Sequence, residues 1–178
     1  AVVAHGLRRL DVGVLVVAPP RSPLPLLLPE DPGVRVLTGT AVKDSELREV
    51  ATSFGDGRYV VIVDDVDQLA VLATEQGFSS TPTLLEEVAQ PTARGGRALV
   101  LTADARPVLT GFPGPSARLI NTALTTGHRL LLTPEDRATA LAHNVPLDPD
   151  QYFTDPPGRG YLVTGRTPTL LQVAVPVR

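Results

Sequence analysis

The stretch Tyr59-Val60-Val61-Ile62-Val63-Asp64-Asp65 decides the fold of this chain, because a short apolar run ends abruptly in two adjacent carboxylates. The run is too short for an amphipathic helix and too uniformly apolar for a strand with one solvated face. It therefore predicts a parallel strand that is buried on both faces. Ligands of open parallel sheets bind just beyond the carboxyl ends of the strands, where Asp64 and Asp65 follow. Hard carboxylate oxygens at such a place suit a nucleotide-bound magnesium ion.

Other apolar runs supply partners for this strand. Each is short and bounded by Gly, Pro or charged residues, as expected for the strands of a sheet. In chain order, the predicted strands cover residues 13–18, 34–37, 98–102, 129–132, 161–164 and 169–175. The short run 34–37 is expected at the outside of the sheet, and the last two runs form a closing pair around a turn at 165–168.

Helical patterns lie between these strands. The helices are expected to begin at Asp44 or Ser45, at residues 80–82, at Ser116 and behind Thr133, where capping side chains or proline favour a helix start. The inward positions at helical spacing are Leu47, Val50, Phe54, Leu84, Leu85, Val88, Leu119, Ile120, Ala123, Leu124 and Leu141. Alternating strands and helices predict an α/β three-layer fold with a mostly parallel sheet and helices on both faces.

Composition excludes several classes of protein. At 178 residues the chain has the length of one domain, so we expect residues 1–178 to form a single domain. The absence of cysteine and the presence of only three histidines argue against a thiolate or histidine-rich metal site. A net charge of -3 argues against attraction of nucleic acid to the whole surface. No apolar run approaches the ~20 residues that span a bilayer, so we expect no membrane contact by this segment.

Two interpretations of the acidic pair remain open from the residues alone. In the first, Asp65 caps the next segment and Asp64 binds the backbone in an Asx turn. In the second, the pair is a Walker B element, in which Asp64 orients magnesium through its waters and Asp65 polarises the attacking water. Aspartate is one methylene shorter than glutamate, and a misplacement of ~1 Å can be costly in rate.

A phosphate-binding loop is the partner that a Walker B element requires. Such a loop is a glycine-rich turn ending in Gly-Lys-Ser/Thr at the N-terminus of a helix. Lys43, the only lysine, lies in Thr38-Gly39-Thr40-Ala41-Val42-Lys43-Asp44, which lacks the spaced glycines and the following hydroxyl. We therefore expect that the chain cannot bind a triphosphate by itself.

The order of the motifs resembles the C-terminal half of FtsK/SpoIIIE-type motor ATPases, which have a RecA-like fold. The acidic strand is followed by the run 98–102, by Ala105-Arg106-Pro107, by a helix with Arg118-Leu119-Ile120-Asn121, by the strand after Gly127 and by a glycine-rich turn at Arg159. The chain looks closest to the divergent actinobacterial members, including the EccC-like ATPase modules of type VII secretion. The likeness covers about Val12 to Val175.

This resemblance implies roles for five residues. Asp64 would bind magnesium and the nucleotide, Asp65 would be the catalytic acid, and Thr102 would be the polar sensor at the end of the next strand. Arg106 and Arg159 would contact phosphate or act as arginine fingers. Active family members usually carry glutamate at the place of Asp65 and Gln-Arg-Pro at the place of Ala105-Arg106-Pro107. Both departures predict a degenerate module.

The resemblance also implies a longer parent protein. The chain has no methionine and opens in a helical pattern without an N-cap, so we expect the phosphate-binding loop to precede Ala1. ATP and magnesium would be cofactors of the parent, with none bound by this fragment. The parent would be cytoplasmic, with a possible tether to the inner face of the membrane outside this segment. It would assemble as a ring of subunits, expected to be a hexamer, and move DNA or a secreted protein.

Three functions follow from these observations. The chain would be part of an ATP-binding motor domain for DNA or protein translocation that is not hydrolytically competent by itself. Alternatively, it would be a degenerate module that binds a peptide or a neighbouring subunit in secretion or cell-division machinery, or it would have a purely structural role there. A response-regulator receiver domain is excluded, because that family needs a lysine after a late strand and Lys43 is the only one here.

Overall fold

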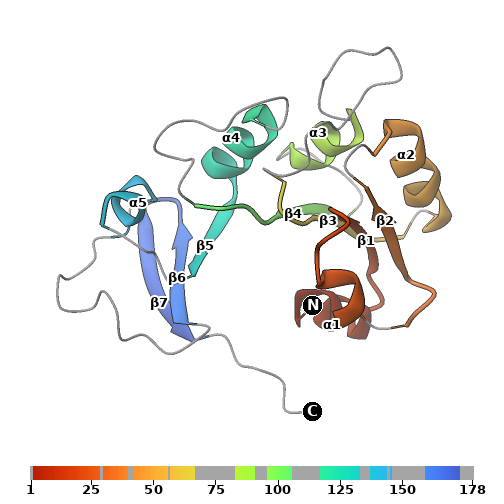
Figure 1. Ribbon diagram of the computed structural model, residues 1–178, viewed down its shortest axis with the longest axis horizontal. Helices are drawn as coiled ribbons and strands as arrows, with labels where there is room; N and C mark the ends of the chain where they lie inside the picture. Colours follow the sequence, from red (N-terminus) through yellow and green to blue (C-terminus); the bar gives the residue numbers. More distant parts are fainter. Residues whose placement is uncertain are drawn as a thin grey trace. The chain divides into compact units, whose positions relative to one another are not determined.

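The computed structural model describes residues 2–28, 30–39, 42–55, 57–66, 83–90, 96–105, 117–132, 137–143, 145 and 159–172. Its elements (Figure 1) are α1 (Val2–Arg9), β1 (Gly13–Ala18), the 3-10 helix η1 (Leu24–Leu27), β2 (Val34–Thr38), α2 (Asp44–Ser53), β3 (Tyr59–Val63), α3 (Thr83–Ala89), β4 (Arg97–Leu101), α4 (Ala117–Thr126), β5 (His128–Leu132), α5 (Arg137–Ala142), β6 (Arg159–Thr164) and β7 (Thr167–Gln172). They fall into two compact units, Ala1–Ala103 with Pro113–Ile120 and Asp104–Phe112 with Asn121–Arg178. That residues 1–178 form a single domain stays a prediction.

A four-stranded parallel sheet forms the centre of the first unit, in the order β2-β1-β3-β4. The interior strands β1 and β3 are buried along their whole length, whereas the outer strands β2 and β4 keep exposed positions. Valine and isoleucine suit such interior strands, because their branched side chains pack well on a pleated surface. The structure thus confirms the buried parallel strand before Asp64 and the outer position of residues 34–37.

Helices cover both faces of this sheet (Figure 1). Successive residues of a strand point to opposite faces of the sheet. On one face, every second apolar residue of β1 and β3 packs in a buried cluster with Ala4 of α1. The other half faces α2 and α3, which bury Leu47 and Leu85 completely. Three layers therefore enclose an apolar interior, as the alternation of strands and helices predicted.

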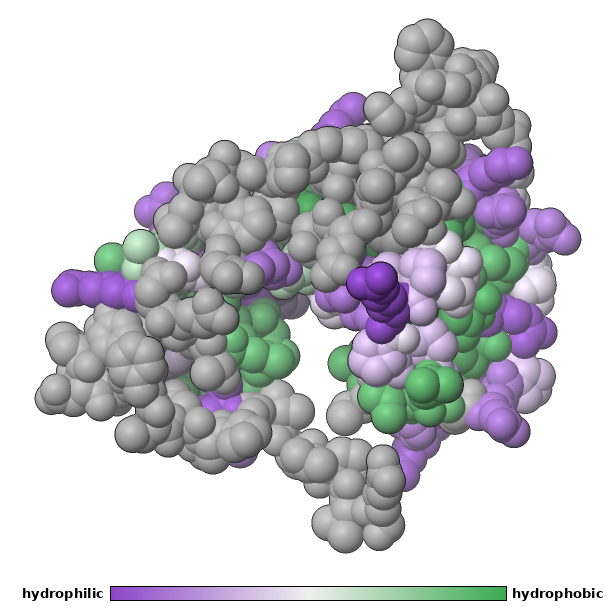
Figure 2. Space-filling view, in the orientation of Figure 1, coloured by the Kyte–Doolittle hydropathy of each residue, from purple (hydrophilic) through white to green (hydrophobic). Residues whose placement is uncertain are grey.

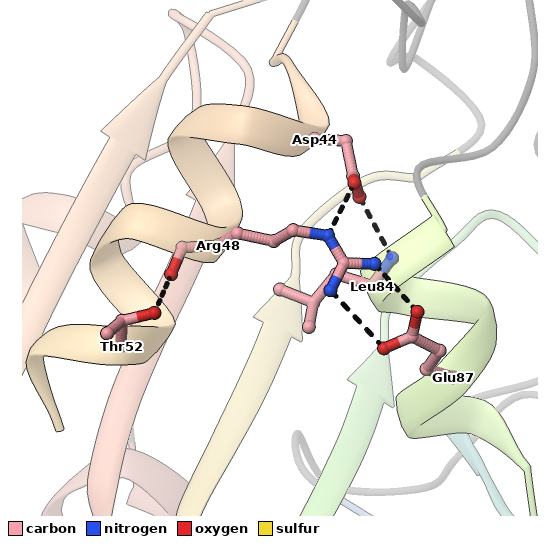
Figure 3. Close-up of polar contacts among 5 residues, drawn as sticks. All are labelled: Asp44, Arg48, Thr52, Leu84 and Glu87. Atoms are coloured by element: carbon pink, nitrogen blue, oxygen red, sulfur yellow. Dashed lines mark hydrogen bonds and ion pairs between the residues drawn. The ribbon is translucent and has the colours of Figure 1, made fainter. Parts of the chain in front are cut away.

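A polar cluster holds α2 against α3 (Figure 3). Asp44 Oδ2 accepts from Arg48 Nε over 2.7 Å, and the Arg48 guanidinium reaches across to Glu87 with Nη2 and Oε1 2.7 Å apart. Asp44 Oδ1 accepts from the Leu84 N–H over 2.9 Å, which satisfies one of the free donors in the first turn of α3. One carboxylate therefore serves both an ion pair and the start of another helix.

The prediction that Asp44 or Ser45 caps α2 was wrong. Lys43 is the N-cap residue of α2, and the Glu46 carboxylate accepts from the Lys43 N–H over 3.1 Å. Asp44 is already the first helical residue, so its side chain is free to turn toward α3. The local sequence correctly predicted where α2 begins. Tertiary packing, however, decided that the Asp44 carboxylate binds the first turn of α3.

The second unit contains an antiparallel sheet in the order β5-β6-β7. Gly165, with φ +62°, and Arg166 form the tight turn between β6 and β7, because Thr164 pairs directly with Thr167. The turn is shorter than the predicted 165–168, and Pro168 lies within β7. Proline is tolerated there because β7 is an outer strand of this three-stranded sheet.

One face of this sheet packs on α5. Leu131, Val163 and Tyr161 form a buried cluster with Ala140 of α5 and with Val145. The prediction that Leu141 points inward was wrong, because Leu141 is 49% exposed while Thr139 and Ala140 are buried. The buried face of this short helix therefore contains Thr139 and Ala140 and not the leucine that follows them.

The surface mixes polar residues with patches of apolar side chains (Figure 2). Among the exposed large apolar residues of the described segments are Leu130, Leu132 and Leu162, all in the second unit. No helix of the described ranges is long and apolar enough to cross a bilayer.

The dual role of Asp44 leads to a prediction about stability. Asp44→Ala should lower the free energy of unfolding in urea by about 1–2 kcal/mol, since it removes a helix cap and a partly buried ion pair. Asp44→Asn keeps an oxygen for the Leu84 N–H and should cost less than half as much. Ser45→Ala is the matched control on the same turn. An equal loss in Ser45→Ala and Asp44→Ala would contradict the assignment.

Candidate functional site

The carboxylate of Asp64 lies at the carboxyl end of β3, between the ends of the two neighbouring strands. The Asp64 N–H donates to Val17 O of β1 over 2.8 Å, so the β1–β3 ladder continues to this residue. On the other side, the Thr102 N–H donates to Val63 O over 3.0 Å and brings the end of β4 level with it. Because the three strands are parallel, their carboxyl ends meet at one edge of the sheet.

Two hydroxyl groups bind the Asp64 carboxylate, one on each oxygen. Ser22 Oγ, in the segment that follows β1, donates to Oδ2 over 2.5 Å. Thr102 Oγ1 donates to Oδ1 over 2.7 Å. Hydrogen bonds to a carboxylate are shorter and stronger than those between neutral groups. Asp64 therefore connects three segments that are distant in the sequence.

A backbone N–H group orients each of these hydroxyls. The Leu24 N–H donates to Ser22 Oγ over 3.0 Å, and the Asp65 N–H donates to Thr102 Oγ1 over 2.8 Å. Each hydroxyl oxygen accepts a hydrogen bond from a backbone N–H, and its own O–H donates a hydrogen bond to the carboxylate. Both series of hydrogen bonds therefore run from the backbone toward Asp64. Hydrogen bonds in series strengthen one another. We call Ser22, Asp64 and Thr102 the carboxylate cluster.

The backbone at Asp65 takes a conformation that few residues adopt. Its φ is +45°, in the left-handed region, where aspartate and asparagine are tolerated better than other residues with a side chain. The turn carries the chain from Asp64 to Val66, whose N–H donates to Thr102 O over 2.9 Å and whose side chain is fully buried. The second acidic residue thus makes a sharp turn that is anchored on both sides.

Three of the five predicted site residues come together. Asp64 and Thr102 are hydrogen-bonded, as their positions at adjacent strand ends suggested, and Asp65 adjoins both. Their roles in binding or catalysis stay predictions. Arg106 lies outside the described residues, and Arg159 is the first residue of β6 in the second unit. For both arginines, phosphate contact stays a prediction.

Neither interpretation of the acidic pair from the sequence included Ser22. The hydrogen bonds found for Asp64 go to side-chain hydroxyls, so the Asx turn to the backbone is not what holds its carboxylate. The available clue was the run Pro19-Pro20, which ends β1 and sends the chain across the same edge of the sheet. That clue becomes useful only when β1 is known to lie beside β3.

The carboxylate and hydroxyl oxygens of the cluster are better suited to coordinate magnesium than to bind a nucleotide. Magnesium in nucleotide sites takes one or two carboxylates, hydroxyls, water and phosphate oxygens. In the described segments, however, no group of three His, Cys, Asp or Glu residues could hold a metal ion. A triphosphate also needs the backbone cradle and lysine of a phosphate-binding loop, and none occurs in the 178 residues. These residues alone therefore do not fit Mg·ATP.

Comparison with known proteins identifies the fold. No family model matches the chain, and no curated protein does. The chain is similar to the solved structure of Thermomonospora curvata EccC (ATPases 2 and 3) in complex with a signal sequence peptide, with a TM-score of 0.54 and 15% sequence identity. The match covers 94% of this chain and only 32% of that one. At this identity the likeness shows the fold alone, and it confirms the predicted RecA-like α/β class.

The carboxylate cluster predicts a specific pattern of mutant stabilities. Thr102→Val keeps the shape but leaves Asp64 Oδ1 and the Asp65 N–H without this partner, and should lower the free energy of unfolding by about 1 kcal/mol. Thr102→Ser keeps the hydroxyl and should cost clearly less. Ser22→Ala should couple to Thr102→Val by about 0.5 kcal/mol or more in a double-mutant cycle, because both bind one carboxylate. Strict additivity in urea unfolding would contradict the shared site.

The backbone at Asp65 gives an independent prediction. Asp65→Gly should raise the free energy of unfolding by about 0.5–1 kcal/mol, because glycine adopts a positive φ without strain. Asp65→Asn should be neutral, and Asp65→Ala should lower the free energy of unfolding by about 1 kcal/mol. Thermal unfolding of the four proteins gives this order. A glycine variant that is less stable than the alanine variant would contradict it.

Proposed function

We propose that this chain is part of an ATPase-type motor module, related to the FtsK/SpoIIIE-like and EccC-like proteins, that does not hydrolyse ATP by itself. The observation that carries the proposal is the carboxylate cluster. It places an aspartate at the carboxyl end of an interior parallel strand, hydrogen-bonded to a hydroxyl at the end of the next strand. Nucleotide-hydrolysing sheets position their magnesium ligand and polar sensor at such a pair of strand ends.

Three features support the absence of hydrolysis. The 178 residues contain no loop that could bind a triphosphate. Each carboxylate oxygen of Asp64 already accepts a hydrogen bond from a hydroxyl group, so both oxygens have a partner without a ligand. Asp65, the candidate for the catalytic acid, has the shorter acidic side chain and sits on a turn with φ +45°. In this proposal Asp64 fastens the ends of β1, β3 and β4, and the phosphate-binding part comes from elsewhere in a longer parent.

The proposed cargo is a protein rather than DNA. The solved EccC structure is a complex with a signal sequence peptide. The structural similarity to part of that protein extends over 94% of this chain. A net charge of -3 gives no general attraction to a polyanion. We accordingly place the parent in a secretion motor of the type VII kind, with further subunits of a ring as its partners.

A second candidate is a degenerate module that binds a peptide or a neighbouring subunit. The observation in its favour is the outer face of the β5–β6 pair, where Leu130 and Leu162 lie opposite each other and are 49% and 37% exposed. Leu132, on the same face, is also exposed. Apolar surface appears in the region of β5 in Figure 2. Contiguous exposed leucines are typical of surfaces that bind other proteins.

The first test is the release of phosphate from ATP by the 178-residue chain with magnesium. We expect a rate equal to that of buffer, and the same rate in Asp64→Ala, because no residue of the chain binds the triphosphate. Asp65→Asn is the matched control for the candidate catalytic acid, because it removes the carboxylate and keeps a residue type that tolerates the positive φ. Turnover that disappears in Asp64→Ala would disprove the proposal.

A second test separates the motor from the binding module. Calorimetric titration of ATP would be made with the chain extended toward the N-terminus of the parent gene product. Submillimolar affinity that is lost in Asp64→Ala supports the motor. Absence of ATP binding, together with saturable binding of a substrate-tail peptide that is weakened by Leu130→Gln, supports the binding module instead.

A further inference from the structure

The two outer strands of the parallel sheet differ in how their free edges are closed. In the described segments β2 pairs only with β1, and β4 pairs only with β3, so each has one edge without a neighbouring strand (Figure 1). Such an edge presents a row of backbone N–H and C=O groups, which proteins usually protect with charged side chains, loops or helices. The partners of these groups therefore indicate where a further strand can be added.

The outer edge of β2 is closed by its own surroundings. The Val14 N–H donates to Gly33 O, so the backbone groups of the next residue, Val34, face outward. The Val34 N–H donates to Asp31 O over 2.9 Å, and Val34 O accepts from Arg35 Nη1 over 3.2 Å. A loop carbonyl and a charged side chain thus occupy the groups that an incoming strand would need.

The outer edge of β4 has no such closure among the described residues. The Thr102 N–H donates to Val63 O, and Thr102 O accepts from the Val66 N–H, so both backbone groups of Thr102 face β3. Backbone groups alternate in direction along a strand, so those of Leu99 and Leu101 face the free edge. No hydrogen bond joins these outward groups to a described residue. β4 therefore presents an edge that can accept a strand.

The side chains of β4 are also those of an interior strand. The run 98–101 is uniformly apolar, which is typical of a parallel strand with neighbours on both sides, whereas β2 carries Arg35. Val100 packs against the buried cluster beneath α1, but Leu99, Val100 and Leu101 all stay partly exposed. A strand on the free edge, with the residues that cover it, would complete their burial.

The position of the carboxylate cluster favours the same edge. Neighbouring strands lie about 4.8 Å apart, so a strand added to β4 would lie about 10 Å from β3, and one added to β2 about 14 Å. If the added strand is parallel, its carboxyl end lies beside Thr102, which is hydrogen-bonded to Asp64. An antiparallel strand would send its following loop to the opposite edge of the sheet.

We propose that the free edge of β4 accepts one further parallel strand, and that this strand leads into the phosphate-binding loop of the parent. The occupant is an apolar extended segment that is followed by a glycine-rich turn ending in Gly-Lys-Ser/Thr. Its backbone pairs with Leu99 and Leu101, and its turn lies beside Thr102. This proposal rests on the proposed function, because it supplies the part that the carboxylate cluster lacks.

The test is amide hydrogen exchange, measured by NMR in the 178-residue chain and in the chain extended toward the N-terminus of the parent gene product. In the 178-residue chain, the Leu99 and Leu101 amides should exchange at least about tenfold faster than those of Val100 and Thr102. In the extended chain they should slow by about a hundredfold or more, because they gain hydrogen-bond partners. Slow exchange at both leucines in the 178-residue chain, or unchanged exchange in the extended chain, would overturn the proposal.

Proline variants identify the edge that is used. Leu99→Pro removes an N–H that faces away from β3, so the 178-residue chain should keep its fold, whereas Val100→Pro removes a bond to β3 and should unfold it. In the extended chain, Leu99→Pro should keep the Leu101 amide in fast exchange. Val36→Pro, on the outer edge of β2, is the matched control and should leave that amide slow. If Leu99→Pro unfolds the chain, Leu101→Pro with the readout at Leu99 replaces it. Full slowing in the folded edge variant would contradict the proposal.

Calorimetric titration of the extended chain with ATP separates this proposal from the proposed function. Slow exchange at Leu99 and Leu101 without ATP binding supports the added strand and contradicts the motor. ATP binding with fast exchange at both residues contradicts the added strand and leaves the motor standing. Slow exchange that appears in the 178-residue chain only at high concentration, with a doubled mass in light scattering, would show pairing with a second copy and overturn the proposal.

Discussion

The position of β3 between β1 and β4 is the constraint on which the first unit depends. A strand in the interior of a parallel sheet has its backbone groups satisfied from both sides, and here every side chain of β3 is buried as well. Such a strand cannot shift by one residue without moving its apolar side chains to the wrong face. The register therefore determines where the apolar run ends, and with it the position of Asp64 at the edge of the sheet.

The carboxylate cluster is the direct consequence of that register. With the end of β3 held level with the ends of β1 and β4, Asp64 meets a hydroxyl from each side. The same atoms have two possible uses. In a nucleotide site they would orient magnesium, and in the chain alone they fasten three strand ends. Whether a phosphate-binding loop is present decides between these uses, because an aspartate contributes little to nucleotide binding without a cradle for the phosphates.

The second unit follows different physical rules. Its antiparallel sheet is covered by α5 on one face, while leucines on the other face are exposed. Antiparallel sheets tolerate one solvated face, but that face is usually polar. Within the covered side, Arg129 and His143 keep polar atoms without partners. The second unit therefore keeps polar atoms without hydrogen-bond partners inside and exposed leucines outside, at two different places.

The sequence by itself determined the strands of the parallel sheet, the α/β class and the presence of Asp64 and Thr102 at one edge of the sheet, because uniform apolar runs specify buried parallel strands and their ends share one edge. It could not determine that Asp44 caps α3 rather than α2, that Leu141 points outward, or that Ser22 completes the cluster. Each of these depends on which side chain lies opposite after packing, and no local pattern encodes that. Tertiary structure alone decided the partners, since hydrogen bonds between residues far apart in the chain form only once the strand order is established.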